Sequence, residues 1–202
     1  LEITTDYVLD ATGRRPNVHG IGLKEAGVNF TNRGVQVDEY LRTNIPNIYA
    51  SGDVLDKAIP KLTPTATFES NYIAAHILGM NDNPISYPAI PSVLYTLPRL
   101  SNIGVSIDEA NNSNDYKVKD IPFGKQMVFE YKNETEAEMT IVLNNDKQLV
   151  GAAIYADDAP DLVNLLTFIV NQKLTAQDLN QMIFAFPGSS SGVLDQLKLA
   201  ML

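Results

Sequence analysis

The sequence contains no cysteine among its 202 residues. These residues can therefore supply no disulfide, no thiolate metal ligand and no redox-active thiol. Basic residues are also scarce, because 15 Lys and Arg stand against 24 Asp and Glu and give a formal net charge of −9. A chain this acidic is poorly suited to nucleic acid or to an anionic membrane surface. We expect neither as a partner.

Long apolar runs are missing as well. No stretch is long enough to span a bilayer, and no basic segment followed by an apolar one marks a secretory signal. Hydrophobic residues make up 45% of the chain, which is typical of a folded globular protein. We expect a cytoplasmic location. Because the sequence opens at Leu1 with a strand-like pattern, LEITTDYVLDATGR, we also expect it to be a piece of a longer chain.

A stretch rich in Pro, Gly, Asn and Asp, residues 79–91, reads as a linker that divides the sequence. Three strands are predicted before it, at residues 3–9, 34–37 and 47–50. Thr63 followed by Pro64 predicts a helix for which Thr63 is the N-cap, and Gly79 is expected to end that helix.

The pattern changes after the linker. Strands are predicted at residues 126–131, 138–144 and 149–155, with a hairpin turn at residues 144–147. Helices are predicted at residues 160–171, at a capping box that begins at Thr175, and at residues 193–201. Strands followed by helices on an antiparallel sheet indicate an α+β fold.

The short stretch NIYASGDV ends in a glycine and a single carboxylate, Gly52 and Asp53. A Gly-Asp pair is good turn chemistry, which is one reading of the stretch. The other is a ligand site, since glycine lets the backbone come close and a carboxylate accepts hydrogen bonds from hydroxyl groups. The stretch alone leaves both readings open.

An ordered set of motifs resembles the C-terminal half of the class I pyridine nucleotide-disulfide oxidoreductases, such as glutathione reductase, dihydrolipoamide dehydrogenase and mercuric reductase. The motifs are ATGRRPN at 11–17, VDEYLRTNIPNIYASGDV at 37–54, LTPTATFESNYIAAHI at 62–77, IPSVLYTLPRLSNIGVSIDEA at 90–110, LVGAAIYADDA at 149–159 and FPGSSSGVLDQL at 186–197. The resemblance implies an antiparallel dimerisation domain preceded by a partial α/β segment of the FAD domain.

The resemblance also implies boundaries, cofactors and partners. Residues 1–12 would be the tail of an NAD(P)-binding domain, residues 13–83 the returning segment of an FAD-binding domain, and residues 84–202 the dimerisation domain. The parent protein would use FAD and NAD(P)H, form a homodimer and pass electrons to a small-molecule acceptor. The fragment itself is expected to be inactive.

Six residues are implied for cofactor binding: Gly13, Arg14, Gly52, Asp53, Thr63 and Thr65. In the family the aspartate of the Gly-Asp pair holds hydroxyls of the FAD ribityl chain, which implies that role for Asp53. A helix N-terminus at Thr63 and Thr65 would favour negative charge at the pyrimidine end of a flavin. A plain N-cap is the other reading of Thr63, and a solvated loop is the other reading of Arg14 and Arg15.

The sequence departs from the family at FAFPGSSSGV. Disulfide-reducing members carry a His-Pro-Thr stretch followed by a Glu, and the His serves as the acid/base across the dimer. Here the matching positions are Phe186, Pro187, Gly188 and Ser191. Phenylalanine has no titratable group and cannot shuttle a proton. We therefore assign no catalytic residue, although the Tyr95 hydroxyl is a weak alternative source of a proton.

Two further readings stay open. The first is a non-catalytic relative that keeps the dimerisation and flavin-binding parts. The second concerns the apolar helix at 160–171, which either lies entirely in the core or also offers a partner surface. His19 and His76 lack metal-ligand spacing and are expected to be structural, and no metal site is predicted.

Overall fold

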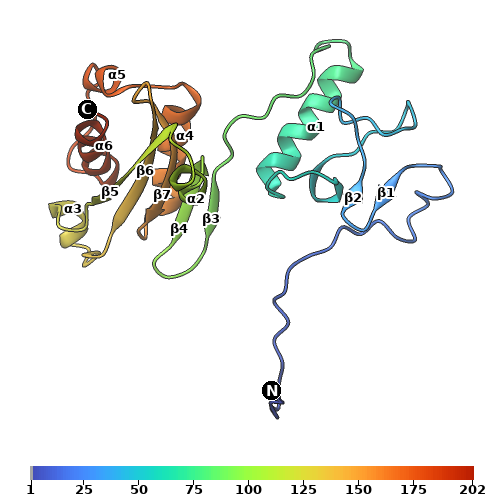
Figure 1. Ribbon diagram of the computed structural model, residues 1–202, viewed down its shortest axis with the longest axis horizontal. Coiled ribbons are helices and arrows are strands. Elements are labelled where there is room, and N and C mark those ends of the chain that lie inside the picture. The colour runs from blue at the N-terminus through green and yellow to red at the C-terminus, as the bar shows by residue number, and fades with distance from the viewer. Residues whose placement is uncertain (1) are drawn as a thin grey trace. The chain divides into compact units, whose positions relative to one another are not determined.

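The computed structural model describes residues 2–202 and divides into two compact units, Leu1–Ser86 and Tyr87–Leu202. Figure 1 shows the first with little sheet and one long helix, and the second with a sheet flanked by helices. We call them the N-terminal unit and the C-terminal unit.

The N-terminal unit contains a small ribbon, a 3₁₀ turn and a helix. Its elements are β1 (Phe30–Thr31), β2 (Gly34–Val35), η1 (Gly52–Val54) and α1 (Thr63–Ile77). β1 and β2 are antiparallel, and Val35 also forms an isolated parallel bridge with Leu55. Two small apolar clusters stabilise the unit; their buried members are Val18, Val28 and Val35 in one, and Leu41, Leu55 and Tyr72 in the other.

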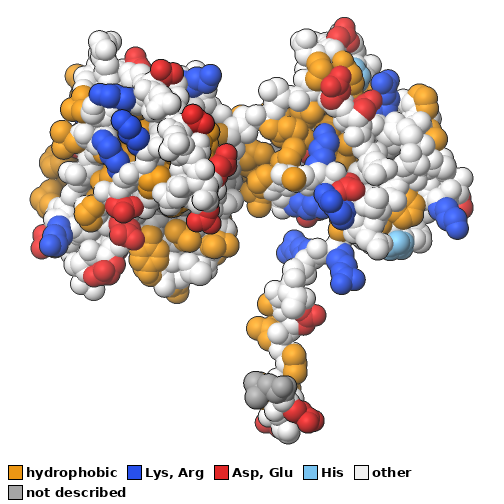
Figure 2. Space-filling view, in the orientation of Figure 1, with side chains coloured by type: hydrophobic (Ala, Val, Ile, Leu, Met, Phe, Trp, Pro, Cys, Tyr) orange, Lys and Arg blue, Asp and Glu red, His pale blue; other side chains and the backbone are white. Residues whose placement is uncertain are grey.

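Three predictions for this unit are wrong. Residues 3–9 form no strand: their side chains are exposed, because no neighbouring strand among the described residues pairs with them. This open segment, with its apolar side chains, is visible below the unit in Figure 2. The strand expected at 47–50 is reduced to an isolated bridge between Arg42 and Tyr49.

The third error concerns the start of α1. Thr63 is the first helical residue rather than the N-cap, which is Leu62 and makes no side-chain cap bond. The Leu62 carbonyl accepts the first helical bond from Ala66 N at 3.0 Å, so the helix begins one residue earlier than predicted. The predicted end is confirmed, since Gly79 follows the helix with φ +67°.

The C-terminal unit is built on a five-stranded antiparallel sheet in the order β3-β4-β7-β6-β5. The strands are β3 (Ser92–Leu94), β4 (Leu100–Gly104), β5 (Tyr116–Pro122), β6 (Glu138–Asn144) and β7 (Leu149–Tyr155). The predicted hairpin between β6 and β7 is confirmed. Asn144 Oδ1 accepts hydrogen bonds from Asp146 N at 3.0 Å and Gln148 N at 2.9 Å, which fixes the turn.

Helices surround this sheet (Figure 1). They are α2 (Ile107–Asn111), α3 (Met127–Glu130), α4 (Ala159–Asn171), α5 (Ala176–Asn180) and α6 (Ser189–Ala200). α4 packs on β4 and β7, while α6 packs on β5 and against α4. The core between them includes fully buried Ile141, Ile154, Leu166 and Leu197. The α+β prediction is confirmed.

One strand prediction in this unit is wrong. Residues 126–131 contain helix α3, and the edge strand is β5 instead. In α3 the adjacent residues Val128 and Phe129 are both buried, which a helical turn allows and a half-buried strand does not. The predicted capping box at Thr175 is confirmed: its hydroxyl accepts from Asp178 N, and the Asp178 carboxylate accepts from Thr175 N.

Candidate functional site

The Gly52–Asp53 pair lies in the 3₁₀ turn η1, which faces helix α1. Gly52 has φ +76°, a conformation that residues with a Cβ seldom adopt. A Cβ added to Gly52 would lie 3.1 Å from the Cβ of Ala66 in α1. Glycine is therefore needed here both for its backbone angle and for the close approach of the helix.

Side chains from α1 and its preceding loop hold this turn. Glu69 Oε2 accepts a hydrogen bond from Gly52 N at 2.5 Å, and the hydroxyls of Ser51 and Ser70 lie 3.1 Å apart. Lys61 Nζ donates to the backbone carbonyl of Asp53 at 2.9 Å. The backbone around Asp53 is thus fixed from two sides.

The Asp53 carboxylate itself is left exposed, with no hydrogen bond or ion pair within residues 2–202. It lines a groove together with the cationic side chains Arg14, Arg15 and Lys61. A groove with one free carboxylate and three cations can accept hydrogen bonds from hydroxyl groups and bind an anionic group, such as a phosphate, at the same time.

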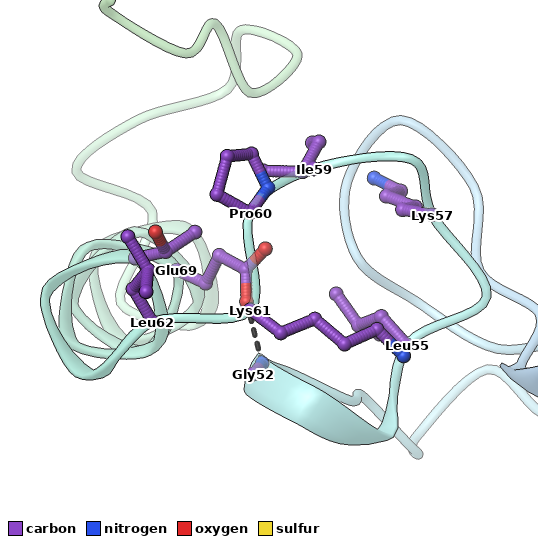
Figure 3. Close-up of a pocket in the computed structure, with 9 residues that line it drawn as sticks. Gly52, Leu55, Lys57, Ile59, Pro60, Lys61, Leu62 and Glu69 are labelled. Carbon is purple, nitrogen blue, oxygen red and sulfur yellow. Dashed lines mark hydrogen bonds between the residues drawn. The ribbon is translucent and has the colours of Figure 1, made fainter. Parts of the chain in front are cut away.

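A second, small pocket borders the turn (Figure 3). Gly52, Lys57, Thr65 and Glu69 are among its lining residues, and its volume of about 10 Å³ suits a single water molecule. Thr65 is only 6% exposed, and its hydroxyl has no hydrogen-bond partner among residues 2–202. Burial lowers the pKa of Lys57, while the charges of Glu69 and Asp38 act in the opposite direction.

The structure brings some of the predicted cofactor residues together. Arg14 and Asp53 share the groove, and Gly52 and Thr65 share the small pocket. Thr63 is exposed at the start of α1 and, like Gly13, lines neither.

Sequence reasoning missed Lys61 and Glu69. Glu69 lies with Thr65 and Tyr72 on the buried side of α1, at spacings of four and three residues. Its position in the middle of this buried stripe could have marked Glu69 as a site residue, because a buried charge needs a partner. Lys61 carried no local signal, since its contact with Asp53 depends on how the loop folds.

In the C-terminal unit, the segment before α6 contains Phe186, which is 72% exposed. The Ser191 hydroxyl, at the position of the family glutamate, donates to the Gly188 carbonyl at 2.9 Å. This hydrogen bond lies within the first turn of α6. Serine also has no carboxylate to offer to an acid/base at position 186. Tyr95 lies on the surface and is 79% exposed.

A charged network anchors the start of α6. Ser189 Oγ donates to Asp158 Oδ2 at 2.6 Å, and Lys132 Nζ donates to the same oxygen and to Ser189 Oγ. Hydrogen bonds from Lys132 and Ser189 lower the pKa of Asp158. Burial opposes the charged form of Lys132, but the hydrogen bond to Asp158 raises its pKa overall. Lys132 is therefore an ammonium donor at neutral pH, not a base.

The two histidines have structural contacts. His76 is stacked by Tyr40 and Tyr72 at ring separations of 5.1 and 6.0 Å, and its Nδ1 lies 2.9 Å from the Asn81 carbonyl. His19 packs edge-on against Phe30. Within residues 2–202, no group of three or more His, Asp or Glu side chains has the arrangement of a metal site.

The combination of a Gly-Asp turn facing a helix and a separate antiparallel α+β unit points to one class of protein. Residues 1–70 match the family described as pyridine nucleotide-disulphide oxidoreductase, and residues 90–196 match the dimerisation domain of that family. The chain belongs to the pyridine nucleotide-disulphide oxidoreductase family. The predicted resemblance is confirmed.

The chain matches the whole of one short relative and part of longer ones. It is 32% identical to a 19.7 kDa protein of the mercuric resistance operon of Staphylococcus aureus, covering 88% of this chain and 100% of that one. It is 34% identical to a dihydrolipoyl dehydrogenase of Bacillus subtilis over 92% of this chain. The match spans only 39% of that dehydrogenase.

Solved structures agree on the fold. The HOCl-induced flavoprotein disulfide reductase RclA from Escherichia coli aligns with a TM-score of 0.82 at 24% identity, covering 94% of this chain and 44% of RclA. LpdA from Mycobacterium tuberculosis aligns with a TM-score of 0.81 at 21% identity, covering 93% of this chain and 41% of LpdA. Among the described residues, no helix is both long and apolar enough to cross a membrane.

Proposed function

We propose that this chain is part of an FAD-dependent NAD(P)H oxidoreductase, to which it contributes one side of the FAD site and a dimer interface. The observation that carries the proposal is the exposed Asp53 carboxylate, which has no partner within residues 2–202 and lines a groove with three cations. FAD offers ribityl hydroxyls to a carboxylate and a diphosphate to cations, so its chemistry suits this groove.

The N-terminus of α1 supports the same proposal. The helix has 15 residues, and Thr63 stands exposed at its start. The free N–H groups and the partial positive charge of a helix N-terminus stabilise a nearby anion. Thr63 would present these groups to the pyrimidine end of a flavin. Thr65 would support them, because its buried side chain lines the small pocket beside the turn.

Bound FAD would supply two-electron chemistry, taking a hydride from NADH or NADPH and passing electrons to an acceptor. In this proposal Gly13, Arg14, Gly52 and Asp53 bind and orient the cofactor. Phe186 offers no proton at the position where disulfide-reducing members of the family carry a histidine. A quinone, oxygen, a metal ion or another small acceptor is therefore a candidate beside a disulfide.

We propose that the C-terminal unit forms a homodimer. The match to the dimerisation domain supports this, and so do exposed apolar side chains on the unit. On α4 the core holds most of the apolar residues, but Phe168 stays 70% exposed. An aromatic side chain this exposed suits a surface that a partner covers. The isolated chain would then be a dimerisation module with half a flavin site, inactive by itself.

A specific observation favours a second candidate, a relative that binds flavin or dimerises without catalysis. Phe186 replaces the acid/base, and Ser191 replaces the carboxylate that follows it. Both changes remove titratable groups from one segment, which suits a protein that no longer transfers protons there. The two candidates differ in whether a reduced nicotinamide bleaches the flavin.

The proposal is tested by the absorbance spectrum of the complete protein, followed by anaerobic titration with NADH and NADPH. A flavin band that bleaches supports the reductase, while a band that neither nucleotide bleaches favours the non-catalytic relative. Asp53→Ala should weaken FAD binding by roughly 10- to 100-fold, since a hydrogen bond to a charged group contributes about 1.5–3 kcal/mol. Asp82→Ala removes the same charge from an exposed position outside the groove. Equal FAD affinities of the two variants would refute the role of Asp53.

A further inference from the structure

We propose that Glu69 is a positioning residue for Asp53: by holding the Gly52 amide, it sets the direction in which the Asp53 carboxylate leaves the turn. The inference rests on the proposed function, because the position of Asp53 matters to FAD only if Asp53 binds it. Glu69 belongs to α1, so it would join the helix N-terminus and the carboxylate into one rigid site.

Burial is the first argument. Glu69 is 2% exposed and lies on the buried stripe of α1. A carboxylate removed from water to this extent costs free energy unless it accepts hydrogen bonds. Glu69 Oε2 accepts one from Gly52 N at 2.5 Å, the residue directly before Asp53 (Figure 3). An apolar side chain would pack α1 as well, so a carboxylate at this position indicates a need for the bond.

The hydrogen bond between Glu69 and Gly52 also removes backbone freedom from the turn. Glycine at φ +76° has access to many other backbone conformations, and each would point Asp53 elsewhere. The Gly52 carbonyl accepts from Leu55 N at 3.1 Å, and the Asp53 carbonyl accepts from Lys61 Nζ. Lys61 is exposed, so its bond competes with water. The bond that Glu69 accepts is partly buried and restrains the turn on the side of α1.

The surroundings keep the charge of Glu69 compatible with burial. Lys57 lines the same small pocket, and its charge interacts with those of Glu69 and Asp38. The adjacent Ser51–Ser70 contact is a second link between the turn and α1, but it is exposed and involves no charge. It therefore provides a matched comparison, one residue away on each segment.

Three variants separate these roles. Glu69→Leu removes the acceptor, Glu69→Gln keeps an acceptor while removing the charge, and Ser70→Ala removes the neighbouring link. The first measurement is hydrogen exchange of the Gly52 amide by NMR on this chain without flavin. Glu69→Leu should speed that exchange by at least about tenfold. Glu69→Gln and Ser70→Ala should each leave it within about threefold.

The second measurement is FAD affinity in the complete protein, with Asp53→Ala alone and combined with Glu69→Leu. Glu69→Leu alone should weaken binding by about tenfold, and it should add almost nothing in the Asp53→Ala background, because its effect passes through Asp53. Additive losses would overturn the positioning role and leave Glu69 as a packing residue. Should Glu69→Leu not fold, Glu69→Gln decides: an affinity more than about tenfold below that of the unchanged protein would overturn the proposal.

The failures are distinguishable. Unchanged Gly52 exchange in Glu69→Leu overturns the inference about Glu69 while the FAD proposal stands. An Asp53→Ala protein with full FAD affinity overturns the proposed function, and with it the positioning role, even if the Gly52 amide responds as expected.

Discussion

Replacing Gly52 with alanine tests how closely α1 approaches the turn. Two costs are expected. A Cβ at φ +76° costs roughly 1–2 kcal/mol of backbone strain. The contact of 3.1 Å with the Ala66 Cβ adds overpacking of about 1–3 kcal/mol. Gly52→Ala should therefore destabilise the N-terminal unit by about 2–5 kcal/mol, measured by urea denaturation and by exchange of the α1 amides.

Gly79 is the matched control. It has φ +67°, but a Cβ there would meet nothing within 4 Å, so Gly79→Ala should show the backbone cost alone. The difference between the two variants should be about 1–3 kcal/mol. Ala66→Gly removes the Cβ that the substituted side chain would contact. In the Gly52→Ala background it should therefore restore part of the lost stability, once the cost of about 1 kcal/mol for a glycine inside a helix is subtracted. Equal losses for Gly52→Ala and Gly79→Ala would refute the reasoning.

Three further predictions concern the C-terminal unit. The pKa of Asp158 is lowered below 3.8, chiefly by its hydrogen bond with Lys132, so this stability is present above that pH and is lost as the pH falls through the lowered pKa. Asp158→Asn should lose about 1 kcal/mol or less at pH 7 and show a flatter acid dependence of Tm; an unchanged acid profile would contradict the role of the network. Leu166→Ala should destabilise the unit by about 2–5 kcal/mol, because Leu166 is fully buried. Phe168→Ser should stay within about 0.5 kcal/mol yet weaken self-association in sedimentation, and undiminished self-association would argue against Phe168 in a dimer interface.

Local chemistry made part of the fold predictable. Side chains that hydrogen-bond to nearby backbone groups define the hairpin at residues 144–147 and the capping box at Thr175. The helix end depends on Gly79, which adopts a positive φ. Such signals lie within a few residues of the element they define. The structure confirms all three.

The errors have a different origin. Residues 126–131 have a strand-like composition, but β5 is the strand that pairs with β6 at that edge of the sheet. The alternation of apolar and polar residues in β5 is weak, because polar residues are common in this edge strand. The strand predicted at residues 47–50 is reduced to the bridge between Arg42 and Tyr49, because no strand in the described part of the chain pairs with it. Tertiary contacts decided both cases, and no short window of sequence contains them.

The candidate site divides in the same way. Gly52 and Asp53 stand out in the sequence because a glycine and a carboxylate share one turn. Glu69 and Lys61 lie 17 and 8 residues from their partners, so only the folded chain connects them to the site. A single sequence identifies the group that faces a ligand more readily than the groups that hold it in place.

The open segment at residues 2–12 has a practical consequence for work on this chain. Ile3, Tyr7, Val8 and Leu9 are each more than 70% exposed, and the segment pairs with no strand in the described part of the chain. An extended stretch with exposed apolar side chains and few backbone hydrogen bonds can pair with the edge of another sheet. In a concentrated sample we expect this stretch to promote self-association, which removal of residues 2–12 would reduce.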